Sequence, residues 1–207
     1  MLPRGTLRLI LGNMFSNKTG MLIHEVSTLR EFGHKKVLVF KPSTDTRSGA
    51  GRIMNFRKEC LECRDVPAQH PLRTLSVIRV EEARLGAAYD VIVFDEMQFF
   101  RPRPFYTLID ELLRRGYDVI AAGLRLDFKG EPFGASLMLI GLCENIQQVS
   151  ILASYCTRCG KPAHLPQRLI DGKPAPYGSP QIKVGGKESY EPRCYAHFEL
   201  PGRASHP

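Results

Sequence analysis

The sequence predicts an α/β fold in which helices flank a parallel sheet, with a small second module at the C-terminal end. Two observations support this fold class. In the first half of the chain, short apolar runs rich in β-branched residues alternate with segments of helical periodicity, as in parallel sheets with covering helices. After about residue 150 the composition shifts to Cys, Gly, Pro, Lys and Tyr with little periodicity. Such a module needs something other than a large core to hold it together.

The first predicted elements form a unit of strand, loop, helix and strand. Leu7 to Leu11 and Lys36 to Phe40 are apolar runs of strand length. Between them, apolar residues recur at helical spacing from Leu22 to Leu29. We therefore predict an amphipathic helix that begins near Lys18.

Further strands and one helix complete the first domain. We predict strands at residues 75–80, 91–94 and 119–122, and a helix at residues 106–114. Residues 45–73 carry Ser, Gly, Arg and Pro without clear periodicity, so we expect a long loop there, with room for a short helix. Loops of this length in compact domains are usually functional.

Composition and charge exclude several classes of protein. At 207 residues, with 43% hydrophobic residues, the chain can bury a core without a partner. It has no apolar run of the roughly 20 residues that a membrane span needs, and no signal peptide pattern, so we expect a cytoplasmic protein without membrane association. The net charge of +8 suits nucleic acid or nucleotide phosphates equally. Because the basic residues are scattered, we do not expect a nucleic acid partner.

Residues 12–19 follow the first strand and open the first helix, which is the place of a phosphate loop. In the pattern G-x-x-x-x-G-K-[ST], backbone N–H groups cradle phosphates, the Lys reaches the β and γ groups, and the hydroxyl binds magnesium. Here Asn17 replaces the second glycine, but Asn tolerates the left-handed backbone. The sequence thus predicts a P-loop NTPase-like sheet whose phosphate site is Gly12, Asn13, Met14, Phe15, Ser16, Asn17, Lys18 and Thr19. An ordinary strand-to-helix turn is the alternative.

Two acidic residues end the apolar run at residues 91–94. Carboxylates that follow a strand lie at the carboxyl edge of the sheet, where α/β proteins bind ligands. Asp95 is therefore a candidate for holding magnesium, and Glu96 for accepting a proton from an attacking hydroxyl. A solvated strand end is the alternative for such a pair.

Two pairs of potential metal ligands lie in the second module. The pairs are Cys156 with Cys159 and Cys194 with His197, each separated by two residues. This spacing lets both side chains of a turn face one ion, so the four residues predict a structural zinc site with no open position for catalysis. Cys60 and Cys63 form another such pair, which could compete by joining Cys156 and Cys159; unpaired thiols are the simpler interpretation.

Several segments resemble, in the same order, the small zinc-containing (type II) thymidine kinase family. They are GNMFSNKT at 12–19, DTR at 45–47, DEMQFF at 95–100, GLRLDFKGEPFG at 123–134, CTRCG at 156–160, QRLIDGKPAPY at 167–177 and VGGKESYEPRC at 184–194. The resemblance runs from about Leu7 to His197. It implies a P-loop nucleotide-binding domain at 1–150, a zinc-ribbon lid that binds the nucleoside at 151–200, and a flexible tail at 201–207.

The resemblance also implies a site and a reaction. Glu96 corresponds to the general base of the family. ATP and Mg²⁺ would contact the phosphate loop together with Asp45, Thr46, Arg47, Asp95 and Gln98. The nucleoside would contact Met14, Phe99, Leu124, Phe128, Phe133, Tyr190 and the segment Gln181, Ile182, Lys183, Val184 and Gly185. The implied reaction is transfer of the γ-phosphate of ATP to the 5′-hydroxyl of thymidine, in pyrimidine salvage, by a homotetramer.

Some positions depart from the family pattern. Asn17 replaces a glycine, Arg125 stands where an acidic residue is common, and Asn55 and Phe56 replace a usual Ser-His pair. Three alternatives therefore remain: a catalytically weakened nucleotide-binding or regulatory relative, a kinase of another deoxynucleoside, and a zinc-ribbon protein that binds nucleic acid. The last predicts strongly salt-dependent binding to oligonucleotides.

Overall fold

A parallel sheet of six strands forms the larger part of the molecule. The computed structural model describes residues 3–183 and 189–203. The strands follow the spatial order β5-β2-β6-β7-β1-β8, and every pairing in the sheet is parallel. The sheet strands are β1 (Leu7–Gly12), β2 (Val37–Pro42), β5 (Arg64–Val66), β6 (Val91–Phe94), β7 (Asp118–Leu124) and β8 (Val149–Leu152).

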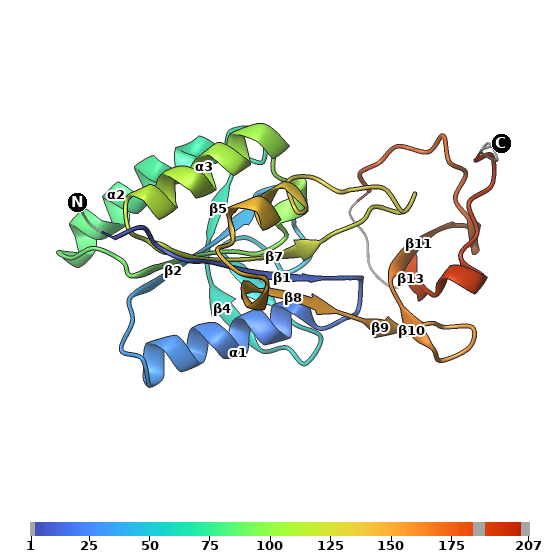
Figure 1. Cartoon of the computed structure of the whole chain (residues 1–207), viewed down its shortest axis with the longest axis horizontal. Helices are drawn as coiled ribbons and strands as arrows, with labels where there is room; N and C mark the ends of the chain where they lie inside the picture. Colours follow the sequence, from blue (N-terminus) through green and yellow to red (C-terminus); the bar gives the residue numbers. More distant parts are fainter. Residues whose placement is uncertain (1–2, 184–188, 204–207) are drawn as a thin grey trace.

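Helices cover both faces of the sheet. Figure 1 shows α2 (Thr74–Leu85) and α3 (Pro102–Arg114) on one face and α1 (Lys18–Glu31) on the other. All residues of β2 and β6 are buried, as expected for strands covered on both sides. The face under α2 and α3 forms one apolar cluster and the face over α1 forms a second. The helical cover leaves the carboxyl edge of the sheet to the loops that carry the candidate site.

Most predicted elements of this domain are confirmed, but one is wrong. Residues 75–80 belong to helix α2 and not to a strand. The buried residues Thr74, Ile78 and Glu81 recur at intervals of four and three, which is helical spacing. Gly86, with φ 69°, ends the helix in the left-handed conformation. The β-branched residues of this segment have a high strand propensity, but packing against the sheet stabilises the helix.

The segment predicted as a long loop contains regular structure. β3 (Arg52–Met54) and β4 (Cys60–Glu62) form an antiparallel hairpin, β5 joins the edge of the main sheet, and a 3-10 turn spans Pro71–Arg73. The three strands have only three residues each, too few to show a period in the sequence. Asn55 and Phe56, at the tip of this hairpin, border the candidate site described below.

The second module is built from short strands. β9 (Ser154–Tyr155) pairs with β10 (Pro162–Ala163), and β11 (Leu165–Ile170) lies between β12 (Lys173–Pro174) and β13 (Tyr190–Arg193). Figure 1 shows this module beside the carboxyl edge of the sheet. The sheet strand β8 runs to Leu152, so the main sheet extends two residues beyond the boundary predicted at 150. Among the described residues, no helix combines the length and apolar character needed to cross a membrane.

Candidate active site and metal centre

The predicted phosphate loop lies between β1 and α1. Asn17 has φ 63° and ψ 31°, the left-handed conformation that a glycine would otherwise supply. Lys18 is buried, and its Nζ donates a hydrogen bond of 2.7 Å to the carbonyl oxygen of Asn13. Gly12 has no room for a side chain, because a Cβ there would lie 2.5 Å from Ser16 Oγ. The loop therefore keeps its compact form despite the substitution at position 17.

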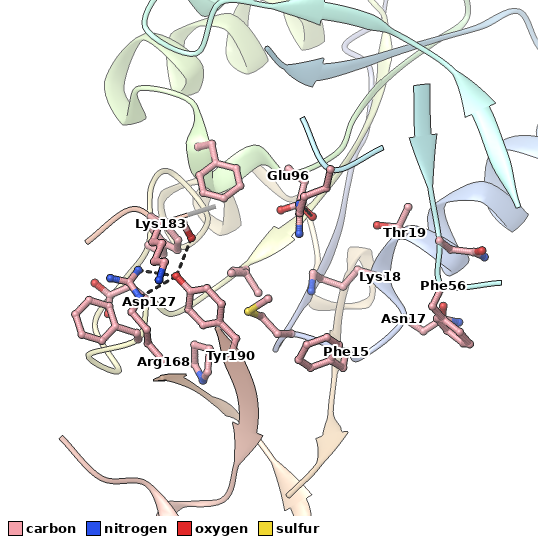
Figure 2. A pocket seen from close by; sticks show the side chains of 18 of the residues that line it. Phe15, Asn17, Lys18, Thr19, Phe56, Glu96, Asp127, Arg168, Lys183 and Tyr190 are labelled. Atoms are coloured by element: carbon pink, nitrogen blue, oxygen red, sulfur yellow. Dashed lines mark hydrogen bonds and ion pairs between the residues drawn. The ribbon is translucent and has the colours of Figure 1, made fainter. Parts of the chain in front are cut away.

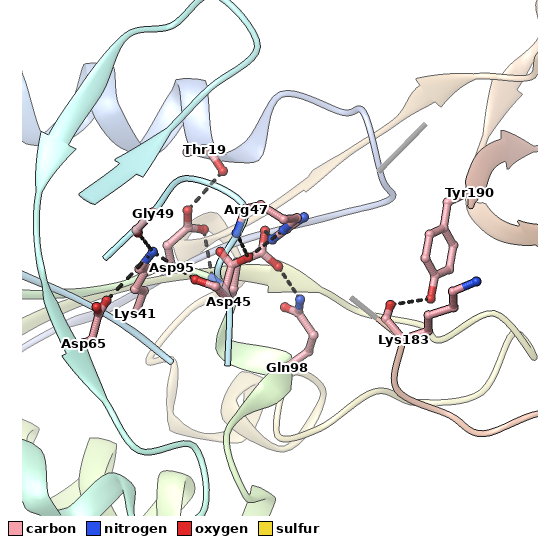
Figure 3. Close-up of polar contacts among 11 residues, drawn as sticks. Thr19, Lys41, Asp45, Arg47, Gly49, Asp65, Asp95, Gln98, Lys183 and Tyr190 are labelled. Atoms are coloured by element: carbon pink, nitrogen blue, oxygen red, sulfur yellow. Dashed lines mark hydrogen bonds and ion pairs between the residues drawn. The ribbon is translucent and has the colours of Figure 1, made fainter. Parts of the chain in front are cut away.

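Thr19 connects this loop to the end of β6. Its Oγ1 donates a hydrogen bond of 3.1 Å to Asp95 Oδ2, and Asp95 is 3% exposed (Figure 3). A hydroxyl and a carboxylate are oxygen ligands of the kind that Mg²⁺ prefers. Burial and the neighbouring Glu96 carboxylate raise the pKa of Asp95 to about 7. A bound cation would favour the ionised form of this side chain.

Glu96 is held by Arg47 from the loop after β2 and by Gln98 from the 3-10 turn that follows β6. Its Oε1 lies 2.6 Å from Arg47 Nη2, and its Oε2 accepts a hydrogen bond of 2.5 Å from Gln98 Nε2. Arg47 Nε also donates to Asp45 Oδ1 at 2.6 Å. Gln98 Oε1 in turn accepts a hydrogen bond from the backbone N–H of Leu124. The Glu96 carboxylate is thereby fixed in position before any ligand binds.

Electrostatics favour an ionised Glu96. Burial opposes ionisation, but the cations of Arg47 and Lys18 and the hydrogen bonds at both oxygens lower the pKa of Glu96. The Glu96 carboxylate in turn raises the pKa of Arg47. Burial lowers the pKa of Lys18, an effect that Glu96 and Asp95 partly offset. Glu96 is thus a carboxylate able to accept a proton, beside two cations able to stabilise phosphate charge.

One cavity joins these groups to a set of aromatic side chains (Figure 2). Lys18, Arg47 and Glu96 line it on the phosphate side, and Phe128 and Tyr190 line it on the side of the small module. Of the predicted site residues, the cavity is lined by Met14, Phe15, Asn17, Lys18, Thr19, Arg47, Glu96, Phe99, Leu124, Phe128, Phe133, Gln181, Lys183 and Tyr190. The structure therefore brings both halves of the predicted site into contact with the same space.

The remaining predicted residues lie elsewhere. Asp95 and Gln98 are buried behind the cavity, where they contact Thr19 and Glu96 respectively. The other predicted residues that do not line the cavity are Gly12, Asn13, Ser16, Asp45, Thr46 and Ile182. Val184 and Gly185 lie outside the described residues.

Several residues of the lining were not among the predicted ones. They are Gly20, Met54, Asn55, Phe56, Asp127, Pro166 and Arg168. Asp127 precedes Phe128 in a segment already singled out, and its position there was the available signal. Met54 ends β3, and Asn55 and Phe56 follow it at the hairpin tip. The family pattern marked positions 55 and 56, but the segment was predicted as irregular, so the sequence did not show that these side chains reach the cavity.

The four predicted metal ligands lie together in the small module. Ligand atoms of Cys156, Cys159, Cys194 and His197 all lie within 4.8 Å of one another. Cys159 Sγ and Cys194 Sγ are 3.7 Å apart, and His197 Nδ1 lies 3.7 Å from Cys156 Sγ and 3.3 Å from Cys194 Sγ. A tetrahedral zinc site with metal–sulfur bonds of about 2.3 Å has sulfur atoms about 3.8 Å apart. These four residues therefore fit a zinc ion.

The chemistry of the cysteines agrees with this geometry. Burial opposes ionisation of Cys156, but hydrogen bonds from the backbone N–H groups of Cys194, Arg158 and Cys159 lower its pKa to about 6. A metal binds the thiolate, so this environment favours coordination. The grouping that used Cys60 and Cys63 is not formed in the described residues; Cys63 is buried, and burial raises the pKa of its thiol to about 12.

Comparisons with known proteins agree with this site. A family model described as thymidine kinase matches residues 5–198. A thymidine kinase of Thermococcus kodakarensis is 43% identical over 199 residues, which cover 96% of both chains. A thymidine kinase of Pyrobaculum aerophilum is 40% identical over 195 residues, which cover 94% of this chain and 99% of the relative. With a phosphate loop, an acidic pair and a Cys₃His cluster in one molecule, the chain belongs to the thymidine kinase family.

Proposed function

We propose that this protein transfers the γ-phosphate of ATP to the 5′-hydroxyl of thymidine. The observation that carries the proposal is the shared cavity, which Glu96 and Lys18 line together with Phe128 and Tyr190. Aromatic faces suit a flat base, and cations suit the phosphates. Both named relatives are thymidine kinases.

The proposed reaction uses positions that the structure describes. Glu96 accepts the proton of the 5′-hydroxyl as the hydroxyl oxygen bonds to the γ-phosphorus. The bond between that phosphorus and the β,γ-bridging oxygen breaks, so ADP leaves and dTMP forms. Lys18 and Arg47 stabilise the negative charge on the transferring group. Catalysis then depends on positioning and electrostatics, with no covalent enzyme intermediate.

Two metals have proposed roles. Thr19 and Asp95 would hold Mg²⁺, which neutralises part of the phosphate charge when bound with ATP. Cys156, Cys159, Cys194 and His197 would hold Zn²⁺, which would link the two ends of the small module. Because four protein side chains would serve as its ligands, such a zinc would be structural.

The experiment that tests the proposal is a substrate panel. The purified protein is incubated with ATP, Mg²⁺ and each common nucleoside, and nucleoside monophosphates are separated and quantified. We expect dTMP as the main product. A monophosphate of another nucleoside alone would overturn the choice of thymidine, and ATP binding without any product would overturn the kinase assignment. The homotetramer and the cytoplasmic location stay predictions.

A further inference from the structure

Arg168 on β11 is a buried cation inside the small module. It is 2% exposed, although it carries a full charge. The four hydrogen bonds described for its guanidinium all end on neutral oxygens: Tyr190 OH receives one from Nε at 2.9 Å and one from Nη2 at 2.6 Å, and the carbonyl oxygens of Pro180 and Gln181 receive one each. Burying a charge is costly, so a cation kept in this position requires an explanation.

Two acceptors of Arg168 are carbonyl oxygens of one short segment, and the third is the hydroxyl of Tyr190 on β13. Pro180 and Gln181 lie in residues 180–183, the last described residues before the gap at 184–188. Tyr190 OH donates a hydrogen bond of 2.8 Å to the carbonyl oxygen of Lys183 (Figure 2). Arg168, directly and through Tyr190, therefore restrains three carbonyl groups within four residues. A second link comes from Gln181 Nε2, which donates to Asp127 Oδ2 at 2.8 Å.

Arg168 also covers a face of the aromatic lining. Its guanidinium carbon lies 4.0 Å from the ring centre of Phe128 and 5.2 Å from that of Tyr190. Both rings line the cavity and are almost fully buried. A ring face stacked against a guanidinium is not available to a base, so a ligand must use the remaining surface of Phe128.

We infer that Arg168 is the positioning residue of the nucleoside half of the site. It fixes segment 180–183 relative to Phe128 and Tyr190, so that backbone polar groups and aromatic surface meet a base in one arrangement. The inference rests on the proposed function, because it assigns the nucleoside to this half of the cavity. A lysine cannot replace this arginine, since a single ammonium group lacks the planar fork that reaches several acceptors at once.

The test compares Arg168→Lys with Arg203→Lys, the same substitution at an exposed position just after the small module. Calorimetric titration measures thymidine binding without ATP and, separately, ATP–Mg binding. We expect Arg168→Lys to weaken thymidine binding about 10- to 100-fold, as for the loss of one or two hydrogen bonds to a charged group, with ATP binding within about twofold of wild type. Arg203→Lys should leave both affinities unchanged.

A double-mutant cycle separates positioning from a general loss of packing. Tyr190→Phe keeps the ring but removes the hydroxyl that Arg168 and Lys183 share. We expect the combined loss of thymidine affinity in Arg168→Lys with Tyr190→Phe to be smaller than the sum of the two separate losses, because both changes release the same segment. Strictly additive losses would contradict this coupling.

The outcomes distinguish this inference from the proposed function. If wild-type protein binds thymidine and Arg168→Lys binds it equally well, the role of Arg168 is refuted and the kinase assignment is unaffected. If Arg168→Lys loses ATP and thymidine affinity to the same extent, its role is structural and the inference is also refuted. A wild-type protein with no affinity for thymidine would refute the proposed function together with this inference.

Discussion

Replacement of Glu96 by glutamine tests the proposed base most directly. Both carboxylate oxygens accept hydrogen bonds, one from Arg47 at 2.6 Å and one from Gln98 at 2.5 Å. A glutamine has the same shape but only one acceptor oxygen, so its NH₂ group must face one of the two donors. The substitution therefore removes the proton acceptor and also breaks one hydrogen bond in a buried site.

The two losses have different sizes and different readouts. A positioned general base typically contributes 10²- to 10⁴-fold, so we expect kcat for dTMP formation to fall by about that factor, or about 2.7–5.5 kcal/mol in activation free energy. Loss of a hydrogen bond between charged and polar groups should lower the free energy of unfolding by about 1.5–3 kcal/mol. Thymidine affinity should stay within about threefold, because the aromatic half of the cavity is unchanged.

The assay combines steady-state kinetics, thymidine titration and urea unfolding. Glu111→Gln on α3 is the matched control, because it removes a carboxylate from a surface ion pair with Arg115. This control should retain wild-type kcat and lose at most about 0.5 kcal/mol of stability. A Glu96→Gln enzyme with kcat within tenfold of wild type, or with thymidine binding as impaired as turnover, would refute the assignment of Glu96 as the base.

Four further measurements test other features. Asn17→Gly should change the free energy of unfolding little, whereas Asn17→Ala should lower it by about 1–2 kcal/mol in urea unfolding, because position 17 is left-handed. Gly134→Ala should lower kcat even at temperatures where the variant is fully folded, because its Cβ would lie 2.5 Å from the backbone oxygen of Gln98 and displace this partner of Glu96. Chelation of zinc, or Cys194→Ser, should expose residues of the small module to hydrogen exchange while the α/β sheet stays protected. The pKa of Asp95 is raised from 3.8 to about 7, so between these values the folded state binds more protons than the unfolded state. The ligand-free protein should therefore lose stability progressively as the pH rises from about 4 to about 7, and Asp95→Asn should reduce this loss in thermal melts.

The sheet was predictable because its signal is local. Residues 37–40 of β2 and all of β6 are continuous apolar runs, as is typical of parallel strands that are buried on both faces. Helix α2 was mistaken for a strand because its β-branched residues favour extended backbone, while the packing that selects a helix comes from distant parts of the chain. The available local signal was Gly86, which is a typical residue just after a helix end.

The site residues likewise divide into those that a local motif predicts and those that depend on distant contacts. Lys18 and Thr19 act from a loop of fixed spacing, so a motif suffices to find them. The spacing of Cys156, Cys159, Cys194 and His197 likewise predicts a shared ligand set. Arg168 lies in a segment quoted for the family resemblance, but no motif spacing indicates its role, because its partners lie 12 to 22 positions away in segments without periodicity. Its role depends on how β11 and β13 pair, which is a property of the folded module.

The junction between β8 and β9 constrains which insertions and deletions the gene can tolerate. Leu152 is paired with Gly12 at the start of the phosphate loop, and two residues later Ser154 begins the small module and contacts the side chain of Asn13. Side chains along an extended chain alternate in direction, so one added or deleted residue here would turn Ser154 away from Asn13. Homologous chains should therefore vary in length at the hairpin tip near residue 57 well before they vary between residues 152 and 154.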